Sequence, residues 1–451
     1  MTTVSQRIAD FASALTWDVL PAAVREKSKV TLLHNLGVAL AGAPLCEAPL
    51  RYARALEESG TTASARLLAN GAAATPDTAA LVNGALMHAR AQDDVYFPGL
   101  THAGAVMTPA VLAVAESTNA KGVDVLTALV AGVEAAAALC QGWGVTSAQR
   151  GFRPTGLFGV FASTVAVARL MKLDAQRTVN AIGIASNASA GVAQSWVSSS
   201  QEWQFHVGMG ARNGILAARL AAAGVTGAPD AFEGIAGFYR AFTGSSEGSD
   251  KVAWDLGTTW RIMDVTYKPF PVCAILQAPV TRAIELAIQN DLKPESIAAV
   301  RIHLNPIEAA IPGTDVKGPF SDTGATLMSA HFCVAVALSK RGVQGTDLKR
   351  YSDPILEGII ARSSVIADPS LGTRSFVLEV DRTDGTTLRH LEKTVGEPFN
   401  WNRDETVANL RRIADELPLG EQQFAVFVDT VLNAEKHSAR EIVDACVAGR
   451  T

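Results

Sequence analysis

Long stretches of the chain carry apolar residues at helical spacing. Between residues 5 and 42 apolar positions recur about every 3.6 residues, which predicts helix, and this stretch ends on Gly42, a residue suited to a helix C-cap. The run Thr75-Pro76-Asp77 predicts another helix start. Because several later segments are apolar on nearly every face, we expect them inside a helical bundle. These segments cover residues 104–118, 122–142, 158–174 and 209–227, the last closed by Gly224.

The pattern changes near residue 260. Pro269 and Pro271 forbid a continuous helix across residues 267–279. Two later segments alternate apolar and polar residues with a period of two, which predicts strands at 296–306 and 373–393. The second contains Asp384-Gly385, a signal for a hairpin turn. Helices are expected over the remaining segments, 325–342, 353–365 and from about 403 to the end.

These changes predict a mainly α protein with two parts. Residues 1–266 and 395–451 are expected to form a large all-α helical domain from both ends of the chain. Residues 267–394 are expected to form a smaller α+β lid domain inserted within it. A chain of 451 residues is long enough for two domains, each with its own core.

Composition narrows the classes of protein. With 48% hydrophobic and 18% charged residues the chain can bury a large core, and a net charge of -5 argues against a nucleic-acid partner. The five cysteines are scattered without metal-binding spacing, which fits free thiols in a reducing compartment and no metal site. The N-terminal stretch carries charges unlike a signal peptide, and no apolar run is long enough to indicate a membrane partner. We therefore expect a cytoplasmic protein. Its alanine-rich helices, more apolar than one chain can cover, also predict a homodimer.

One loop gathers polar residues between two apolar stretches. Residues 91–104 read AQDDVYFPGLTHAG and contain Asp93, Asp94, Tyr96 and His102. Because charged groups avoid burial unless they are paired or used, this loop either caps a helix or forms one wall of a site.

Four stretches together resemble the MmgE/PrpD family, which includes 2-methylcitrate dehydratase, cis-aconitate decarboxylase and iminodisuccinate epimerase. They read GFRPTGLFGVFASTVAVARLMKLD, ARNGILAARLAAAGVTGAPDAFEGIAGFY, YKPFPVCAILQAPVTRAIEL and HFCVAVAL, and the similarity runs over almost the whole chain. The resemblance implies a helical domain with an α+β lid, a homodimer, a site between the domains and, as in most members, no cofactor. It also implies chemistry that begins by removing a proton next to a carboxylate.

The polar loop corresponds to the family's acid-rich pattern HxxDxDDTxxxxxxH. His88 and the pair of aspartates match, while Ala91 and Val95 stand where the family has aspartate and threonine. The resemblance implies proton transfer by His102, and an orienting or substrate-binding role for Asp94. The resemblance also implies that two neighbours, Asp93 and Tyr96, bind the substrate. The alternative is that the aspartates cap a helix and that the histidine is a packed polar residue.

Two further motifs fall in the helical domain. In GFRPTG, Arg153 replaces the family's histidine and brings a permanent cation suited to a carboxylate, so substrate binding is favoured over a plain surface charge. In WQFHVGMGARNG, His206 agrees with the family and Trp203 replaces its lysine. This tryptophan either stacks on an apolar part of the substrate or belongs to the core.

The last motif begins the predicted lid. In YKPFPVCAILQAP the resemblance gives Lys268 and Tyr267 catalytic positions, and Gln277 replaces a histidine, so it can hydrogen-bond the substrate but cannot titrate. Neighbouring side chains in extended backbone point to opposite sides, so only one of the first two residues can face the cleft squarely. The resemblance favours the lysine over a solvated residue at a domain joint.

The surviving and missing positions together predict the function. We expect a cofactor-free lyase or isomerase that abstracts a proton alpha to a carboxylate of a small carboxylic acid, by dehydration, decarboxylation or epimerisation. Since one aspartate, one lysine and two histidines of the family pattern are replaced, the substrate should differ from 2-methylcitrate and cis-aconitate. The alternative is a non-catalytic small-molecule-binding protein on the same scaffold.

Overall fold

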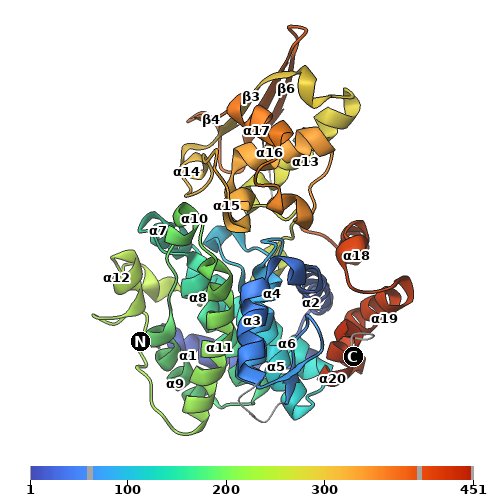
Figure 1. Ribbon diagram of the computed structural model, residues 1–451. Helices are drawn as coiled ribbons and strands as arrows, with labels where there is room; N and C mark the ends of the chain where they lie inside the picture. Colours follow the sequence, from blue (N-terminus) through green and yellow to red (C-terminus); the bar gives the residue numbers. More distant parts are fainter. Residues whose placement is uncertain (1, 58–63, 394–398, 448–451) are drawn as a thin grey trace.

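The computed structural model describes residues 2–57, 64–393 and 399–447, and the chain forms a mainly α fold with a small α+β portion (Figure 1). The helices are α1 Val4–Ala14, α2 Ala22–Gly42, α3 Glu47–Glu57, α4 Pro76–His88, α5 Ala103–Thr118, α6 Gly122–Cys140, α7 Trp143–Gln149, α8 Pro154–Leu170, α9 Ala175–Ala185, α10 Gln194–Ser198, α11 Glu202–Ala222, α12 Phe238–Thr243, α13 Gln277–Gln289, α14 Pro306–Ala309, α15 Thr323–Met328, α16 Ala330–Lys340, α17 Pro354–Ala361, α18 Arg403–Arg412, α19 Glu421–Leu432 and α20 Ala439–Val447. The strands are β1 Ala65–Arg66, β2 Ala73–Ala74, β3 Ile297–Leu304, β4 Ser363–Ala367, β5 Phe376–Arg382 and β6 Thr387–Glu392.

The centre of the helical part is a bundle in which α8 packs against α5, α6 and α11, and α4 packs against α5 and α11. Nearly all residues of α5, α6 and α8 are buried, which confirms the prediction that these apolar helices lie inside a bundle. Glycines let the backbones approach closely, since a Cβ on Gly84 would lie 2.8 Å from Cα of Gly208. Small residues thus give this bundle its tight packing.

The predicted ends of these helices can be compared with the structure. Thr75 caps α4 by accepting a hydrogen bond from the backbone of Thr78, and Gly224 follows α11 with φ of 93°, so both predictions are confirmed. The predicted helix end at Gly42 is confirmed, since α2 ends there, but the glycine is not a left-handed cap, because its φ of -79° is ordinary helical backbone. A Cβ there would lie 2.3 Å from the carbonyl oxygen of Leu86, so this glycine serves the close approach of α2 and α4.

The α+β portion lies at one end of the molecule in Figure 1 and contains a sheet in the order β4-β3-β5-β6. Strand β3 pairs parallel to β4 and antiparallel to β5, and β5 and β6 form an antiparallel hairpin. The turn between them contains Gly385 with φ of 86°, which confirms the hairpin predicted from Asp384-Gly385. Helices α13 and α16 pack against each other and contact β5 and β4.

Two helix predictions in this portion need correction. The segment 353–365 ends its helix at Ala361 and then forms β4, whose short β-branched run pairs with the parallel strand β3. The segment 325–342 contains two helices rather than one, because the chain breaks at Ser329. The hydroxyl of this serine accepts a hydrogen bond from the backbone N–H of Phe332 and so starts α16.

The chain returns to the helical part after the sheet, where α18 and α19 pack on α2, and α20 packs on α5 and α6. Both ends of the chain therefore contribute to the helical part, as the two labelled termini in Figure 1 show. The predicted lid limit at residue 394 lies outside the described residues.

Within the part of the chain that the structure describes, one helix is long and apolar enough to cross a bilayer by length and composition. This helix is α6, and 89% of its most apolar window is buried within the protein. Residues 22–45 and 47–54 pass the same test only when taken together as one bent pair.

Candidate functional site

The polar loop joins α4 to α5 and lies beside the segment through which the chain enters the α+β portion. Val95 and Thr266 exchange two backbone hydrogen bonds of 2.9 and 3.0 Å, which attach the loop to the segment that leads to Lys268. Ala91 adopts φ of 48°, a left-handed conformation that costs a residue with a Cβ about 1 kcal/mol or more. Its carbonyl oxygen accepts a 2.5 Å hydrogen bond from Nζ of Lys268. A strained loop residue thus helps to hold the lysine.

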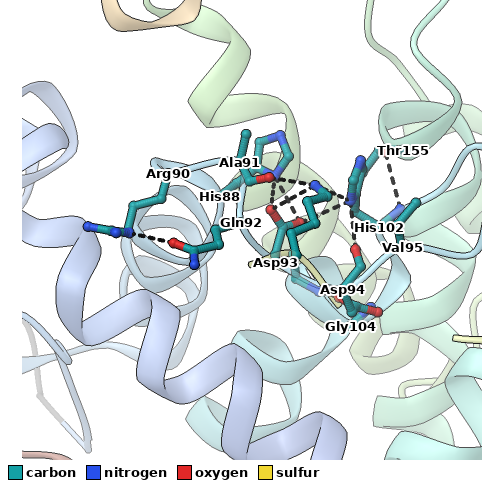
Figure 2. Close-up of polar contacts among 12 residues, drawn as sticks. His88, Arg90, Ala91, Gln92, Asp93, Asp94, Val95, His102, Gly104 and Thr155 are labelled. Atoms are coloured by element: carbon teal, nitrogen blue, oxygen red, sulfur yellow. Dashed lines mark hydrogen bonds and ion pairs between the residues drawn. The ribbon is translucent and has the colours of Figure 1, made fainter. Parts of the chain in front are cut away.

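Figure 2 shows His102 among acidic and basic neighbours. Its Nδ1 lies 2.6 Å from the backbone oxygen of Asp94, 3.2 Å from a carboxylate oxygen of Asp93 and 3.4 Å from Nζ of Lys268. Because two of these three neighbours are acceptors, Nδ1 carries the proton and donates it. The lone pair of the neutral ring therefore lies on Nε2, for which no hydrogen-bond partner is found among the described residues.

His88 connects the same aspartate to Arg153. Its Nδ1 lies 3.0 Å from both carboxylate oxygens of Asp93, and its Nε2 contacts a guanidinium nitrogen of Arg153. Arginine can only donate, so Nε2 accepts and Nδ1 carries the proton. Burial lowers the pKa of His88 to about 3, so this ring is a neutral bridge between the aspartate and the arginine.

Charges and burial shift the pKa values in this cluster in opposite directions. Burial alone would raise the pKa of Asp93, but His88, Lys268 and His102 hold it well below its usual range. Burial lowers the pKa of Lys268 against the pull of the aspartate. Burial and then the lysine charge lower the pKa of His102. The imidazole is therefore neutral and able to accept a proton at neutral pH.

The carboxylate of Asp94 belongs to the framework of the loop. It accepts hydrogen bonds from the backbone of Gly104 at 3.0 Å and Ala105 at 3.1 Å, and from Asn35 at 3.1 Å. It thereby satisfies the first N–H groups of α5, as the capping alternative predicted. Burial and then Asp93 raise its pKa to about 7. Its contact with His102 runs through the backbone oxygen.

Arg153 is buried among aromatic side chains, only 7% exposed. It donates to the backbone oxygen of Trp203 at 2.8 Å, and its guanidinium lies 5.0 Å above the ring of Trp196. Trp203 is fully buried, packs 4.9 Å from Trp196 and reaches Asp322 of the α+β portion with its indole N–H at 3.4 Å. The arginine thus lies in an aromatic wall that joins the two portions.

His206 is half-buried beside this wall. A Cβ on Gly191 would lie 3.5 Å from Nδ1 of His206 and 3.7 Å from Cβ of Arg153, so both residues flank the same glycine. Among the described residues Nδ1 of His206 is buried without a hydrogen-bond partner. Burial lowers the pKa of this histidine to about 4, so the ring is neutral.

Three predicted site residues direct their polar atoms away from this cluster. The hydroxyl of Tyr96 donates to Gln141 at 3.3 Å. The hydroxyl of Tyr267 shares a 2.8 Å hydrogen bond with Thr31, while its neighbour Lys268 points into the cluster, as extended backbone requires.

Gln277 also faces away from the cluster. Its amide exchanges hydrogen bonds of 3.1 and 3.0 Å with the backbone of Phe270 and donates to the oxygen of Val272 at 2.8 Å. Together with Lys268 and Tyr267 it lines a cavity of about 20 Å³, room for about one water molecule.

The structure adds residues that the sequence prediction did not place at the site. His88 matched the acid-rich pattern, so its bridging role had a signal in the sequence. Asn35 on α2 and Trp196 on α10 had none, because only the folded chain brings them to the loop and to Arg153. Within the described residues no group of three or more histidine, cysteine, aspartate or glutamate side chains could hold a metal ion.

Comparison with known proteins shows the family of the chain. The family model for the MmgE/PrpD N-terminal domain matches residues 6–250, more than half of the chain. The chain belongs to the MmgE/PrpD family. The match includes the acid-rich loop, Arg153 and His206 but not Lys268 or Gln277.

The MmgE/PrpD relatives are similar at low identity. Cis-aconitate decarboxylase of Aspergillus terreus is 26% identical over 296 residues, which cover 62% of this chain and 59% of that protein. Cis-aconitate decarboxylase of Homo sapiens is 28% identical over 251 residues, 54% of this chain and 48% of that protein. The protein of the same name from Mus musculus is 26% identical over 334 residues, 71% of this chain and 66% of that protein. The chain thus matches about half to two thirds of the length of these relatives.

Proposed function

We propose that this protein is a lyase or isomerase that removes a proton alpha to a carboxylate of a small carboxylic acid, without a cofactor. The observation that carries the proposal is the fixed tautomer of His102. Its Nδ1 is held by Asp94 and Asp93 at 2.6 and 3.2 Å, which leaves the lone pair on Nε2 for a substrate proton.

The first step moves one proton and leaves one electron pair. His102 takes the proton from the carbon next to the carboxylate, and the electrons of the broken C–H bond spread into the carboxylate. Asp93 then faces an imidazolium whose positive charge it stabilises. The positive charges of Lys268 and Arg153 stabilise the negative charge that develops on the substrate.

The fate of the intermediate separates the reactions of this class. Loss of hydroxide from the neighbouring carbon gives dehydration. Loss of carbon dioxide from a substrate with a second carboxylate leaves a further electron pair on the substrate, so decarboxylation also requires that the proton held by His102 returns and that one more proton is taken up from water. Return of the proton on the opposite face gives epimerisation. The relatives named cis-aconitate decarboxylase favour a lyase over an isomerase.

The substrate should differ from cis-aconitate and 2-methylcitrate. Trp203 stands where the resemblance expects a lysine, and its indole packs against His88 and Asp322. Gln277 stands where the resemblance expects a histidine and is engaged with backbone groups. Neither residue supplies a charge or a proton. The cavity of about 20 Å³ beside Lys268 is also far smaller than an ordinary ligand site of several hundred Å³.

We also propose a cytoplasmic homodimer. All five cysteines are free, which suits a reducing compartment. The outer face of α11 exposes Met209 and Leu216, which are 45% and 48% exposed and would suit an interface.

The competing proposal is a binding protein that has kept the scaffold and lost catalysis, since a buried arginine also suits an anion-binding site. Deuterium exchange separates the two. The protein is incubated in deuterated water with hydroxy, unsaturated and amino carboxylic acids that carry one to three carboxylates, and mass spectrometry follows each acid. We expect deuterium at the carbon next to a carboxylate in at least one acid. Absence of deuterium from every acid would favour the binding protein.

A further inference from the structure

Arg153 differs from the other buried cations around the site in its partners. Lys268 has Asp93 at 3.9 Å, and Arg90 forms a two-pronged ion pair with Glu416 at 2.7 and 3.0 Å. Among the described residues no carboxylate lies within ion-pair distance of the Arg153 guanidinium, whose nearest acid, Asp93, lies beyond His88. Its hydrogen-bond partners are uncharged, and a buried charge without a counter-ion is costly, which indicates that an anion completes this position.

A second observation points to the same place. His206, which flanks Gly191 together with Arg153, has a buried Nδ1 without a partner among the described residues. A neutral imidazole with its proton on this nitrogen donates to an oxygen placed between the two side chains. A guanidinium and an imidazole N–H on two side chains that flank one glycine can serve the two oxygens of a carboxylate.

The charges of the cluster limit how many carboxylates it can hold. With Asp93, Lys268 and Arg153 ionised, the cluster carries one positive charge in excess. Ionisation of Asp94, whose pKa is about 7, removes that excess. A second substrate carboxylate within this cluster would lie beside two aspartates, and the cluster itself has no further cation for it.

Two other cations lie near the loop, and one of them, Arg374, lines the cavity beside Lys268. The ammonium of Lys27 bonds Asn400 at 2.5 Å and lies 4.4 Å from the ring centre of Tyr267. The guanidinium of Arg374 lies 4.7 Å from the ring centre of Phe97.

We propose that the substrate carries a single carboxylate, bound by Arg153 and His206, with an uncharged remainder that lies against the indole of Trp196. This inference rests on the proposed function and specifies its substrate class. A 3-hydroxy monocarboxylic acid with an apolar or aromatic substituent fits it. Removal of the proton at carbon 2 and departure of the 3-hydroxyl with a proton would give the unsaturated acid and water, and the carboxylate would stay on Arg153.

Calorimetric titration tests the inference apart from catalysis. The ligands are 3-hydroxybutanoate and 3-hydroxy-3-phenylpropanoate with one carboxylate, malate with two and citrate with three. We expect at least one monocarboxylate to bind about tenfold or more tightly than malate and citrate. Arg153→Gln should weaken that binding at least about tenfold, the scale of a lost hydrogen-bonded charge, and Arg153→Lys should weaken it less. Arg150→Gln, at an exposed arginine three positions earlier, is the control and should bind as the wild type does.

Tighter binding of malate or citrate, or no binding of either monocarboxylate, would overturn the inference. Unchanged binding by Arg153→Gln would overturn it as well, whether or not Arg153→Lys also binds unchanged. If Arg153→Gln does not fold, as judged by circular dichroism, Arg153→Lys decides, because an ammonium cannot reproduce the two-pronged contact of a guanidinium. Deuterium exchange with the same ligands separates the two proposals. Binding as expected without exchange leaves the single-carboxylate site standing and rejects only the proposed catalysis.

Discussion

Asp94 and His102 hold each other in place through two different groups of the aspartate. The backbone oxygen of Asp94 accepts the Nδ1 proton of His102 at 2.6 Å, and its carboxylate accepts the N–H groups of Gly104 and Ala105 at the start of α5. The aspartate therefore fixes both the helix that begins directly after the histidine and the tautomer of the histidine itself.

The carboxylate of Asp94 should make the stability of the protein depend on pH. Its pKa is about 7 in the folded protein and 3.8 as a model value, so the folded state favours the protonated form. Its contribution to stability is fully present below pH 3.8 and is lost as pH rises toward 7. The loss is at most about 4 kcal/mol. Asp94→Asn, which cannot ionise, should show a smaller fall in the free energy of unfolding between pH 4.5 and 8.

Urea denaturation of the wild type and the variant at each pH measures this difference. Glu134, whose pKa burial also raises to about 7, contributes the same trend to both proteins, so only their difference reports Asp94. Parallel curves for the two proteins would show that the carboxylate does not titrate in this range.

Lys268→Ala should lower turnover at least about a hundredfold, the usual scale for one preorganised charge-stabilising group. The variant should also lose some stability, since the buried lysine donates a hydrogen bond to a loop carbonyl and pairs with Asp93 at 3.9 Å, so circular dichroism must show that it is folded. The lysine also lowers the pKa of His102, so its removal should raise that pKa and move the acidic limb of the kcat/KM profile to higher pH.

Turnover and pH profiles of Lys268→Ala and of Lys317→Ala, an exposed lysine, check this prediction. The assignment of Lys268 is wrong if the variant stays folded and dimeric and turns over substrate within a few-fold of wild type. An unshifted acidic limb would show that the lysine does not act on the histidine.

Cis-aconitate and 2-methylcitrate should be poor substrates. Trp203 replaces the lysine of the family pattern, which removes a partner for a carboxylate, and Gln277 replaces a histidine, which removes a proton carrier. Each replacement should cost about a hundredfold in rate or more. Steady-state assays with both acids, beside a family dehydratase and a family decarboxylase, measure this loss. A specific activity equal to that of either reference enzyme contradicts the prediction.

The protein should be a dimer in solution. Static light scattering at micromolar concentration should give about twice the 47.3 kDa mass of one chain. A mass near that of a single chain would refute the dimer. Replacing Met209 and Leu216 by glutamate, two exposed apolar residues on one face of α11, should lower the mass if this face is the interface.

The sequence predicted helices well where apolar periodicity and polar ends agreed. Thr75 and Gly224 gave the right ends because a capping hydroxyl and a left-handed glycine act locally. Gly42 also marked the right helix end, but the sequence could not show why a glycine is needed there, because the reason is the close approach of α4. Strand β4 was missed for a similar reason, since its short run follows a helix directly and becomes a strand only by pairing with β3.

The sequence predicted which loop carries the candidate site, but it predicted less of how the side chains of that loop are arranged. The sequence named Asp93, Asp94 and His102 as a group, and the structure brings all three together. It could not show that the Asp94 carboxylate would cap α5, because the partners are backbone groups and Asn35. Roles in catalysis and substrate binding for the predicted residues, including Tyr96 and Gln277, remain predictions.

The central claim is that Nε2 of His102 accepts the substrate proton. The rate of deuterium exchange at the carbon next to the carboxylate tests it most directly, with the acid that exchanges fastest in the panel. His102→Gln should lower this rate about a hundredfold to ten-thousandfold, because glutamine keeps hydrogen bonding but cannot take a proton. His437→Gln, at a partly exposed histidine paired with Glu441, should exchange as fast as the wild type. Exchange by a folded His102→Gln variant at a rate within a few-fold of the wild type would contradict the account.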